Sequence, residues 1–129
     1  MATATQVAMF LENKPGALAR VAAALAKAKV NVEAISVCET QDYGVVRMVT
    51  SSAAKTKAAL KKLGVSFTTS RVIVTKLPNT PGVLAKVSKK LAKAGVNIEY
   101  VYGSAAGKGR DATIVIKADK TGKAAAALR

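Results

Sequence analysis

The chain has 129 residues, half of them hydrophobic but only 4% aromatic, and its excess of Lys and Arg over Asp and Glu gives a formal net charge of +14. The single cysteine, Cys38, excludes a disulfide within the chain, and no apolar run reaches the roughly 18 to 20 residues that span a bilayer. We therefore expect a cytoplasmic protein with no membrane partner, whose positive charge favours an anionic one.

The first elements form a strand, a helix and a hairpin. Residues 6–11 predict a short strand, because this apolar run ends at turn residues. A helix follows, because apolar residues recur at intervals of three and four and predict its buried stripe. That stripe comprises Leu18, Val21, Ala22, Leu25 and Ala28. Residues 30–39 and 45–50, rich in β-branched side chains, predict a second strand and the strand that pairs back onto it.

The next segment joins two similar halves without a linker. Ser51 or Ser52 is expected to cap a second helix that ends at Gly64. Residues 65–69 then predict a strand that runs directly into another at residues 71–77, with no Gly, Pro or Ser-rich stretch between them. Two halves joined in this way are not expected to tumble independently.

The second half repeats the pattern of the first. Its predicted helix has an inward stripe of Leu84, Val87, Leu91 and Ala94. Strands are predicted at residues 97–105 and 112–118, with residues 106–110 as a hairpin tip, and Asp119 is expected to cap a last helix. No fourth strand follows, so either a tail or another segment must cover that sheet edge.

A duplicated motif carries the clearest signal. Asn13-Lys-Pro-Gly-Ala-Leu18 returns as Asn79-Thr-Pro-Gly-Val-Leu84, and 13 of 21 aligned positions are identical from Asn13 to Glu33 and from Asn79 to Glu99. Each turn precedes a helix, where several N–H groups lack partners and can hold a carboxylate, and glycine leaves room for a ligand. The asparagines can cap the helix or point an amide at the ligand. A purely structural turn explains the same residues equally well.

The duplicated segments resemble the ACT domain, and the resemblance extends from about residue 5 to residue 128. It implies an α+β fold of two ferredoxin-like βαββαβ repeats, with antiparallel sheets, helices on one face, and a second repeat that lacks its last strand. Repeat 1 would occupy residues 1–70 and repeat 2 residues 71–129. It also implies ligand contacts at the turn and at the start of the second strand, namely Asn13, Pro15, Gly16, Ala17, Leu18, Asn31, Val32, Asn79, Pro81, Gly82, Val83, Leu84, Asn97 and Ile98.

The function we expect is a non-enzymatic regulatory module. The chain has no histidine, its seven carboxylates show no metal-ligand spacing, and we expect no catalytic residue, metal or cofactor. The resemblance implies that a free amino acid or similar small effector binds at the interface between repeats. It further implies an enzyme of amino-acid metabolism as a partner. We also expect a homodimer, because a unit of about 65 residues is marginally stable alone and packing on a second chain would stabilise it. The alternative is an interaction module whose basic face recruits an acidic protein; nucleic acid is less favoured, since stacking aromatics are lacking.

Three further side chains have structural interpretations. Cys38 lies within a predicted strand and is expected to be a small buried hydrophobe. Glu33 and Glu99 are expected to pair with nearby lysines. Tyr100 and Tyr102 alternate onto one strand face and are expected to pack in an interface or a core.

Overall fold

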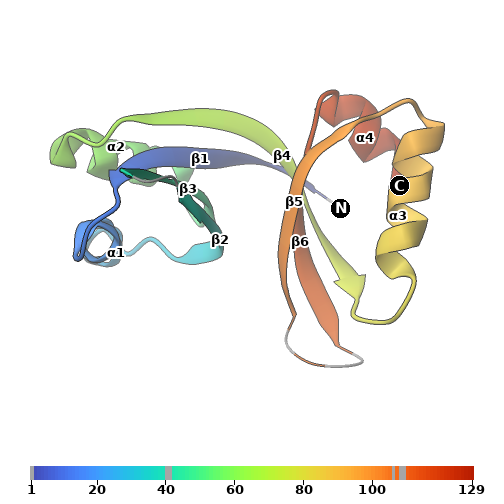
Figure 1. Ribbon diagram of the computed structural model, residues 1–129, viewed down its shortest axis with the longest axis horizontal. Coiled ribbons are helices and arrows are strands. Elements are labelled where there is room, and N and C mark those ends of the chain that lie inside the picture. The colour runs from blue at the N-terminus through green and yellow to red at the C-terminus, as the bar shows by residue number, and fades with distance from the viewer. Residues whose placement is uncertain (1, 40–41, 106, 108–109) are drawn as a thin grey trace. The chain divides into compact units, whose positions relative to one another are not determined.

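The computed structural model describes residues 2–39, 42–105, 107 and 110–129 of the chain (Figure 1). It divides into two compact units. The N-terminal unit comprises residues 5–70, and the C-terminal unit comprises residues 71–129 together with residues 2–4. The elements in chain order are β1 (Ala2–Glu12), α1 (Ala17–Lys27), β2 (Val32–Glu39), β3 (Tyr43–Thr50), α2 (Ala53–Leu63), β4 (Phe67–Pro78), α3 (Val83–Lys93), β5 (Ile98–Ala105), β6 (Asp111–Ala118) and α4 (Thr121–Ala127).

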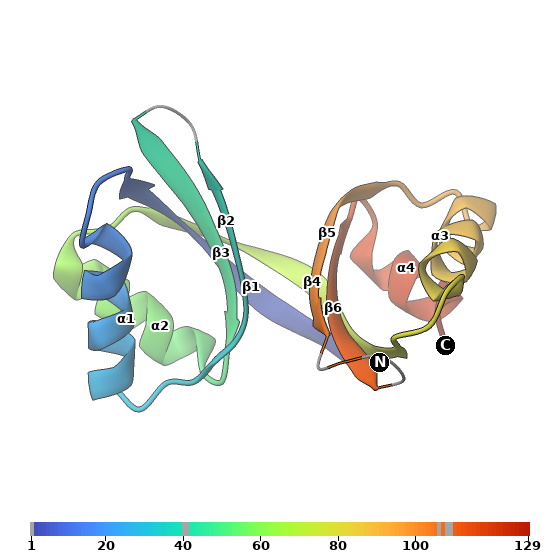
Figure 2. The same ribbon diagram turned by 60° about the horizontal axis from the view of Figure 1, so that its bottom comes forward.

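The N-terminal unit is a sheet in the order β2-β3-β1-β4, with α1 and α2 on one face (Figure 2). Strand β3 pairs antiparallel with both β1 and β2, so that Tyr43 lies opposite Glu12 and Thr50 opposite Val32. Alternate residues of β1 and β3 meet the buried stripe of the helices, as expected of a sheet covered on one side. The core residues are Val7, Met9, Leu11, Val21, Leu25, Val30, Val46, Met48 and Leu60.

The C-terminal unit has the same arrangement in β4, β5, β6, α3 and α4. Strand β6 pairs antiparallel with β4 and β5, placing Ile116 opposite Ile73 and Val101. Helices α3 and α4 cover one face of these strands (Figure 2). The core residues are Ile73, Val87, Leu91, Val96, Ile116, Ala118 and Ala124. The structure therefore confirms two ferredoxin-like α+β repeats with helices on one face of antiparallel strands.

The first residues of β1 cover the edge of β4 in the C-terminal unit, for which the sequence predicts no neighbouring strand. Among the described residues no strand follows α4, as predicted. The edge of β4 away from β6 is instead bordered by residues 2–4, and the Arg71 side chain donates a hydrogen bond from Nη2 to Oγ1 of Thr3. Residues 2–4 thus take the place in the C-terminal unit that residues 67–70 take in the N-terminal unit.

The helix predictions are partly confirmed. Ser52 caps α2 by accepting a hydrogen bond from the N–H of Lys55, and Gly64 ends that helix in a left-handed conformation. Asp119 does not cap α4, whose N-cap is Lys120. Leu18 and Leu84 are 40% and 54% exposed, so neither belongs to the buried stripe of its helix. In α1 the preceding residue, Ala17, packs against the core instead. No helix in the described part of the chain is long and apolar enough to cross a bilayer.

Candidate functional site

The two Pro-Gly turns share one backbone conformation. Gly16 and Gly82 are the N-cap residues of α1 and α3, with φ of 87° and 88°. This left-handed region is costly for any residue with a Cβ atom. A Cβ added to either glycine would meet no atom within 4 Å, so the backbone conformation, and not lack of space, requires glycine. The space beside each glycine is open to a ligand.

The asparagines hold the turns against the neighbouring hairpins. The Asn13 side chain donates to Oε2 of Glu39 at 3.2 Å, and its N–H donates to the carbonyl of Asp42 at 2.8 Å. The Asn79 side chain donates to the Gly107 carbonyl at 3.0 Å. Neither asparagine caps its helix, so that part of the sequence interpretation is wrong. Both instead fix the position of the turn.

Backbone donors remain available at the start of α1. Within the described residues, the N–H groups of Leu18 and Ala19 have no hydrogen-bond acceptor, because the first turn of a helix lacks intrahelical partners. The preceding N–H, on Ala17, reaches the carbonyl of Lys14 at a long 3.4 Å. These groups and the positive end of the helix dipole favour an anion at this point.

A cavity of about 500 Å³ lies beside the turn in the N-terminal unit. The turn and α1 form one wall, and the end of α2 with the residues after it forms another. Its lining residues are Phe10, Leu11, Glu12, Lys14, Pro15, Gly16, Ala17, Arg20, Val21, Tyr43, Leu63, Gly64, Val65 and Ser66. The size suits a small molecule.

Charged side chains surround this cavity. Arg20 donates from Nη2 to the carbonyl of Leu63 at 3.0 Å, which links α1 to the end of α2. Glu12 and Lys14 form an ion pair at 3.0 Å, with both side chains about 60% exposed. The cavity thus combines a guanidinium and an ammonium with one carboxylate that is held only by an exposed ion pair.

A smaller hollow of about 140 Å³ lies on the other side of the same turn. Asn13, Ala17 and Leu18 line it together with Val37 and Glu39 of β2. The five site residues predicted between positions 13 and 18 therefore border one hollow or the other, and Ala17 borders both.

The start of β2 does not approach the turn of the same unit. Val32 lies opposite Thr50, at the far end of β3 from Tyr43, which pairs beside the turn. Asn31 and Val32, which are predicted to contact the ligand, therefore lie far from the turn of their own unit. The reason is that β1 and β2 run parallel on either side of β3, so the end of one is distant from the start of the other.

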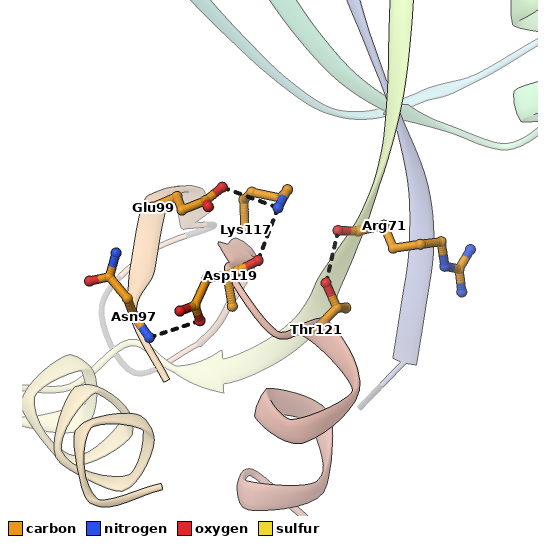
Figure 3. A network of polar contacts seen from close by, with 7 residues as sticks. Arg71, Asn97, Glu99, Lys117, Asp119 and Thr121 are labelled. Carbon is orange, nitrogen blue, oxygen red and sulfur yellow. Dashed lines mark hydrogen bonds and ion pairs between the residues drawn. The ribbon is translucent and has the colours of Figure 1, made fainter. Parts of the chain in front are cut away.

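Asn31 and Asn97 have matching structural roles. The Asn31 N–H donates to Oγ of Ser51 at 2.9 Å, and the Asn97 N–H donates to Oδ1 of Asp119 at 3.0 Å (Figure 3). Val32 and Ile98, which follow them, are half-buried against the cores of their units. In each unit this contact ties the start of one strand to the segment that enters the last helix.

In the C-terminal unit, the turn residues lie in an equivalent place. Pro81 and Gly82 are exposed, Val83 is half-buried, and Leu84 is exposed at the start of α3. A hollow of about 590 Å³ in this unit lies along the exposed side of α3, between lysines, and none of these four residues lines it.

The remaining sequence interpretations have mixed outcomes. Glu99 pairs with Lys117 at 3.1 Å, as predicted (Figure 3). Cys38 is exposed and not buried, because it lies near the end of the edge strand β2. The rings of Tyr100 and Tyr102 stack with their centroids 6.4 Å apart, so they pack on each other.

Arg20 is a charged lining residue that the sequence analysis did not place in the site. The available signal was the repeat itself, since this position carries Arg in the first copy and Lys in the second. Leu63 and Gly64 were also missed, because only the folded chain brings the end of α2 beside the turn.

Two units of this topology define a pair of ferredoxin-like α+β modules. The chain belongs to the ACT domain family, since the family model for an ACT domain pair matches residues 2–128.

Solved structures support the assignment. Protein BT0572 from Bacteroides thetaiotaomicron is similar with a TM-score of 0.90 and 36% identity, over 98% of this chain and 86% of that one. The ligand-free regulatory subunit of aspartate kinase from Thermus thermophilus has a TM-score of 0.70 and 23% identity, over 99% and 91%. The subunit from Thermus flavus has a TM-score of 0.67 and 21% identity, over 98% and 93%. These two show likeness of fold alone. No protein with a curated function matches the chain.

Proposed function

We propose that this protein is a non-enzymatic regulatory module that binds a free amino acid or a similar small effector beside the Pro15-Gly16 turn. The observation that carries the proposal is the cavity of about 500 Å³, which joins the start of α1 to charged side chains of both signs. Membership of the ACT domain family supports the same function.

A zwitterion matches the charges around the cavity. Its carboxylate would lie at the N-terminal end of α1, near the guanidinium of Arg20. Its ammonium would take the place of Lys14 against Glu12. An exposed ion pair contributes only about 0 to 1 kcal/mol, so opening the Glu12–Lys14 pair costs little.

The effector would act on a partner. Two structural neighbours are regulatory subunits of aspartate kinase, which supports an enzyme of amino-acid metabolism as the partner. Differential affinity for two conformations would transmit the signal. That the complete site lies at the interface between repeats stays a prediction. The proposed ligand contacts of Asn31, Val32, Asn97 and Ile98 also stay predictions.

A second copy of the chain would cover an exposed apolar strip beside the turn. Leu18, Ile35 and Val37 are 40%, 45% and 56% exposed, at the start of α1 and on the edge strand β2. Large side chains exposed along a strand that lacks a neighbour on one side favour pairing with another chain. We therefore propose a homodimer, which light scattering of the protein in solution would test.

The binding proposal is tested by thermal shift with each of the twenty amino acids. An effector at about 100 times its Kd should stabilise the protein by about 2.7 kcal/mol. Gly16→Val should abolish this shift, because the branched side chain enters the open space beside the turn. Gly82→Val is the matched control: it imposes the same backbone strain at φ 88° but should leave the shift intact.

Two outcomes would count against the site. A response that survives in Gly16→Val would place the effector elsewhere, and no response to any amino acid at millimolar concentration would contradict the function. The variant Arg20→Lys tests the role of the guanidinium, because it keeps the positive charge but loses the planar group that can donate two parallel hydrogen bonds to a carboxylate. We expect it to weaken effector binding about tenfold, a difference of about 1.4 kcal/mol.

A further inference from the structure

A groove with a floor of small residues lies between α1 and α2, away from the turn. Its volume is about 690 Å³. Ala24 and Ala28 contribute from α1, and Ala58, Ala59 and Leu63 contribute from α2. The remaining lining residues are Lys27, Lys55 and Lys62, all exposed.

The lysines at the rim are not neutralised. Helices α1 and α2 contain no Asp or Glu, so no pairing within either helix is available. The ion pairs in the described part of the chain, Glu12–Lys14 and Glu99–Lys117, include none of the three rim lysines. In the ion pairs that the structure describes, these lysines have no carboxylate partner, and an anionic occupant of the groove would supply one.

The spacing of the rim lysines fits a helix. Lys55 and Lys62 are seven residues apart on α2, which places them on one side of the groove about 10 Å from each other along the axis. Lys27 lies on the α1 side. Acidic residues seven apart on a bound helix would match the α2 pair.

The alanine floor selects the same kind of partner. Alanines allow a second helix to approach within the roughly 8 to 10 Å at which helices pack, and they offer apolar surface to its Leu or Ile side chains. A phosphate backbone would use the lysines but not this floor. Apolar floor and basic rim together match a helix that is apolar on one side and acidic on its flanks.

We propose that the α1–α2 groove is a docking site for an acidic amphipathic helix of a partner protein. This surface lies on the N-terminal unit and shares only Leu63 with the lining of the proposed effector cavity. It would serve to recruit the partner whether or not an effector is bound.

The test uses a synthetic peptide of about 18 residues, or five turns, with Leu at alternating three- and four-residue intervals and Glu seven apart on the flank. Binding of the fluorescent peptide to the full chain is followed by anisotropy at about 50 mM and about 300 mM salt. The variant K55E/K62E reverses the charge at two of the three rim lysines. The variant Ala58→Gln puts a larger side chain at an exposed position of the groove floor and so blocks it, while glutamine remains a good helix former.

Matched controls lie on α3. Lys86 and Lys93 are also exposed and seven residues apart, so K86E/K93E makes the same change in net charge away from the groove. Ala92→Gln matches the change at Ala58. We expect K55E/K62E to lose at least about tenfold in affinity and Ala58→Gln at least about fivefold, whereas the controls change it by less than about twofold.

Four results would overturn the proposal. The first is the absence of binding by the wild-type chain at low salt. The second is an equal loss of affinity in K55E/K62E and K86E/K93E, which would show attraction by net charge alone. The third is an unchanged affinity in Ala58→Gln. The fourth is a DNA duplex that binds as tightly as the peptide and loses as much affinity in K55E/K62E. Circular dichroism of each variant verifies that it is folded.

Discussion

The two Pro-Gly turns have nearly the same backbone but different polar surroundings. Gly16 and Gly82 differ by about one degree in φ and ψ, and in both turns an asparagine donates hydrogen bonds to the adjacent hairpin. Around them the two copies differ at several positions, of which four pairs bear on ligand charge. The pairs are Glu12 and Pro78, Lys14 and Thr80, Arg20 and Lys86, and Tyr43 and Asp111.

This difference separates structure from ligand chemistry. The identical residues, Asn, Pro and Gly, build the turn and hold it in place. The charges that could select a zwitterion lie at positions where the copies differ: Lys86 stands in place of Arg20 and Pro78 in place of Glu12, so the guanidinium and the carboxylate of the first cavity have no counterparts at those two positions. The effector should therefore bind beside Gly16 far more tightly than beside Gly82.

Equivalent core leucines test whether the cores match as closely as the turns. Leu25 and Leu91 are 1% and 0% exposed at corresponding places on α1 and α3. Truncation to alanine at either position should cost about 2 to 5 kcal/mol, because it leaves a cavity that the surroundings only partly fill. Urea unfolding measures this loss. A cost for Leu91→Ala below half that of Leu25→Ala would show that the cores are not equivalent.

Removal of the first four residues tests the borrowed strand of the C-terminal unit. Loss of the hydrogen bonds beside β4 should reduce stability by about 1 to 3 kcal/mol. Amide exchange should speed up at residues 72–74 while residues 45–49 of β3 stay protected. Thr3→Ala, which removes only the contact with Arg71, is the milder control. Equal acceleration in both units would contradict the assignment of residues 2–4 to the C-terminal unit.

The last helices of the two units, α2 and α4, differ in their N-caps, and substitutions at these caps should have the smallest effect on stability. Ser52→Ala should cost about 1 kcal/mol, because the N–H of Lys55 loses its acceptor. The corresponding helix α4 has no side-chain cap at Lys120, so Lys120→Ser should raise stability by a fraction of that amount. Thermal melting measures both, and a loss on Lys120→Ser would contradict the comparison.

Local patterns predicted most of the fold. The duplicated motif gave the element order, and the absence of a linker predicted the continuous strand now seen from Phe67 to Pro78. The stripe of each helix was placed only in part, since Ala17 and Leu18 both satisfy helical spacing with Val21 and only packing decides between them. For the same reason Leu84 was wrongly expected in the core.

Contacts between distant residues were beyond sequence reasoning. Nothing local in Ala2 to Thr5 indicates a strand that completes the C-terminal unit. Asn13 does not cap α1, because the N-cap position falls three residues later at Gly16, and its side-chain amide instead donates to Glu39, 26 residues away. The cavity likewise depends on Leu63 and Gly64, which lie far along the chain from the turn.

Each long strand, β1 and β4, belongs to both units, and this fixes how the protein can be divided. A break between residues 70 and 71 would cut through the middle of β4. A fragment of residues 71–129 would lose its border of residues 2–4 and expose a bare edge, which invites aggregation. A gene encoding one half would therefore have to carry a copied strand from the other before its product could be handled alone.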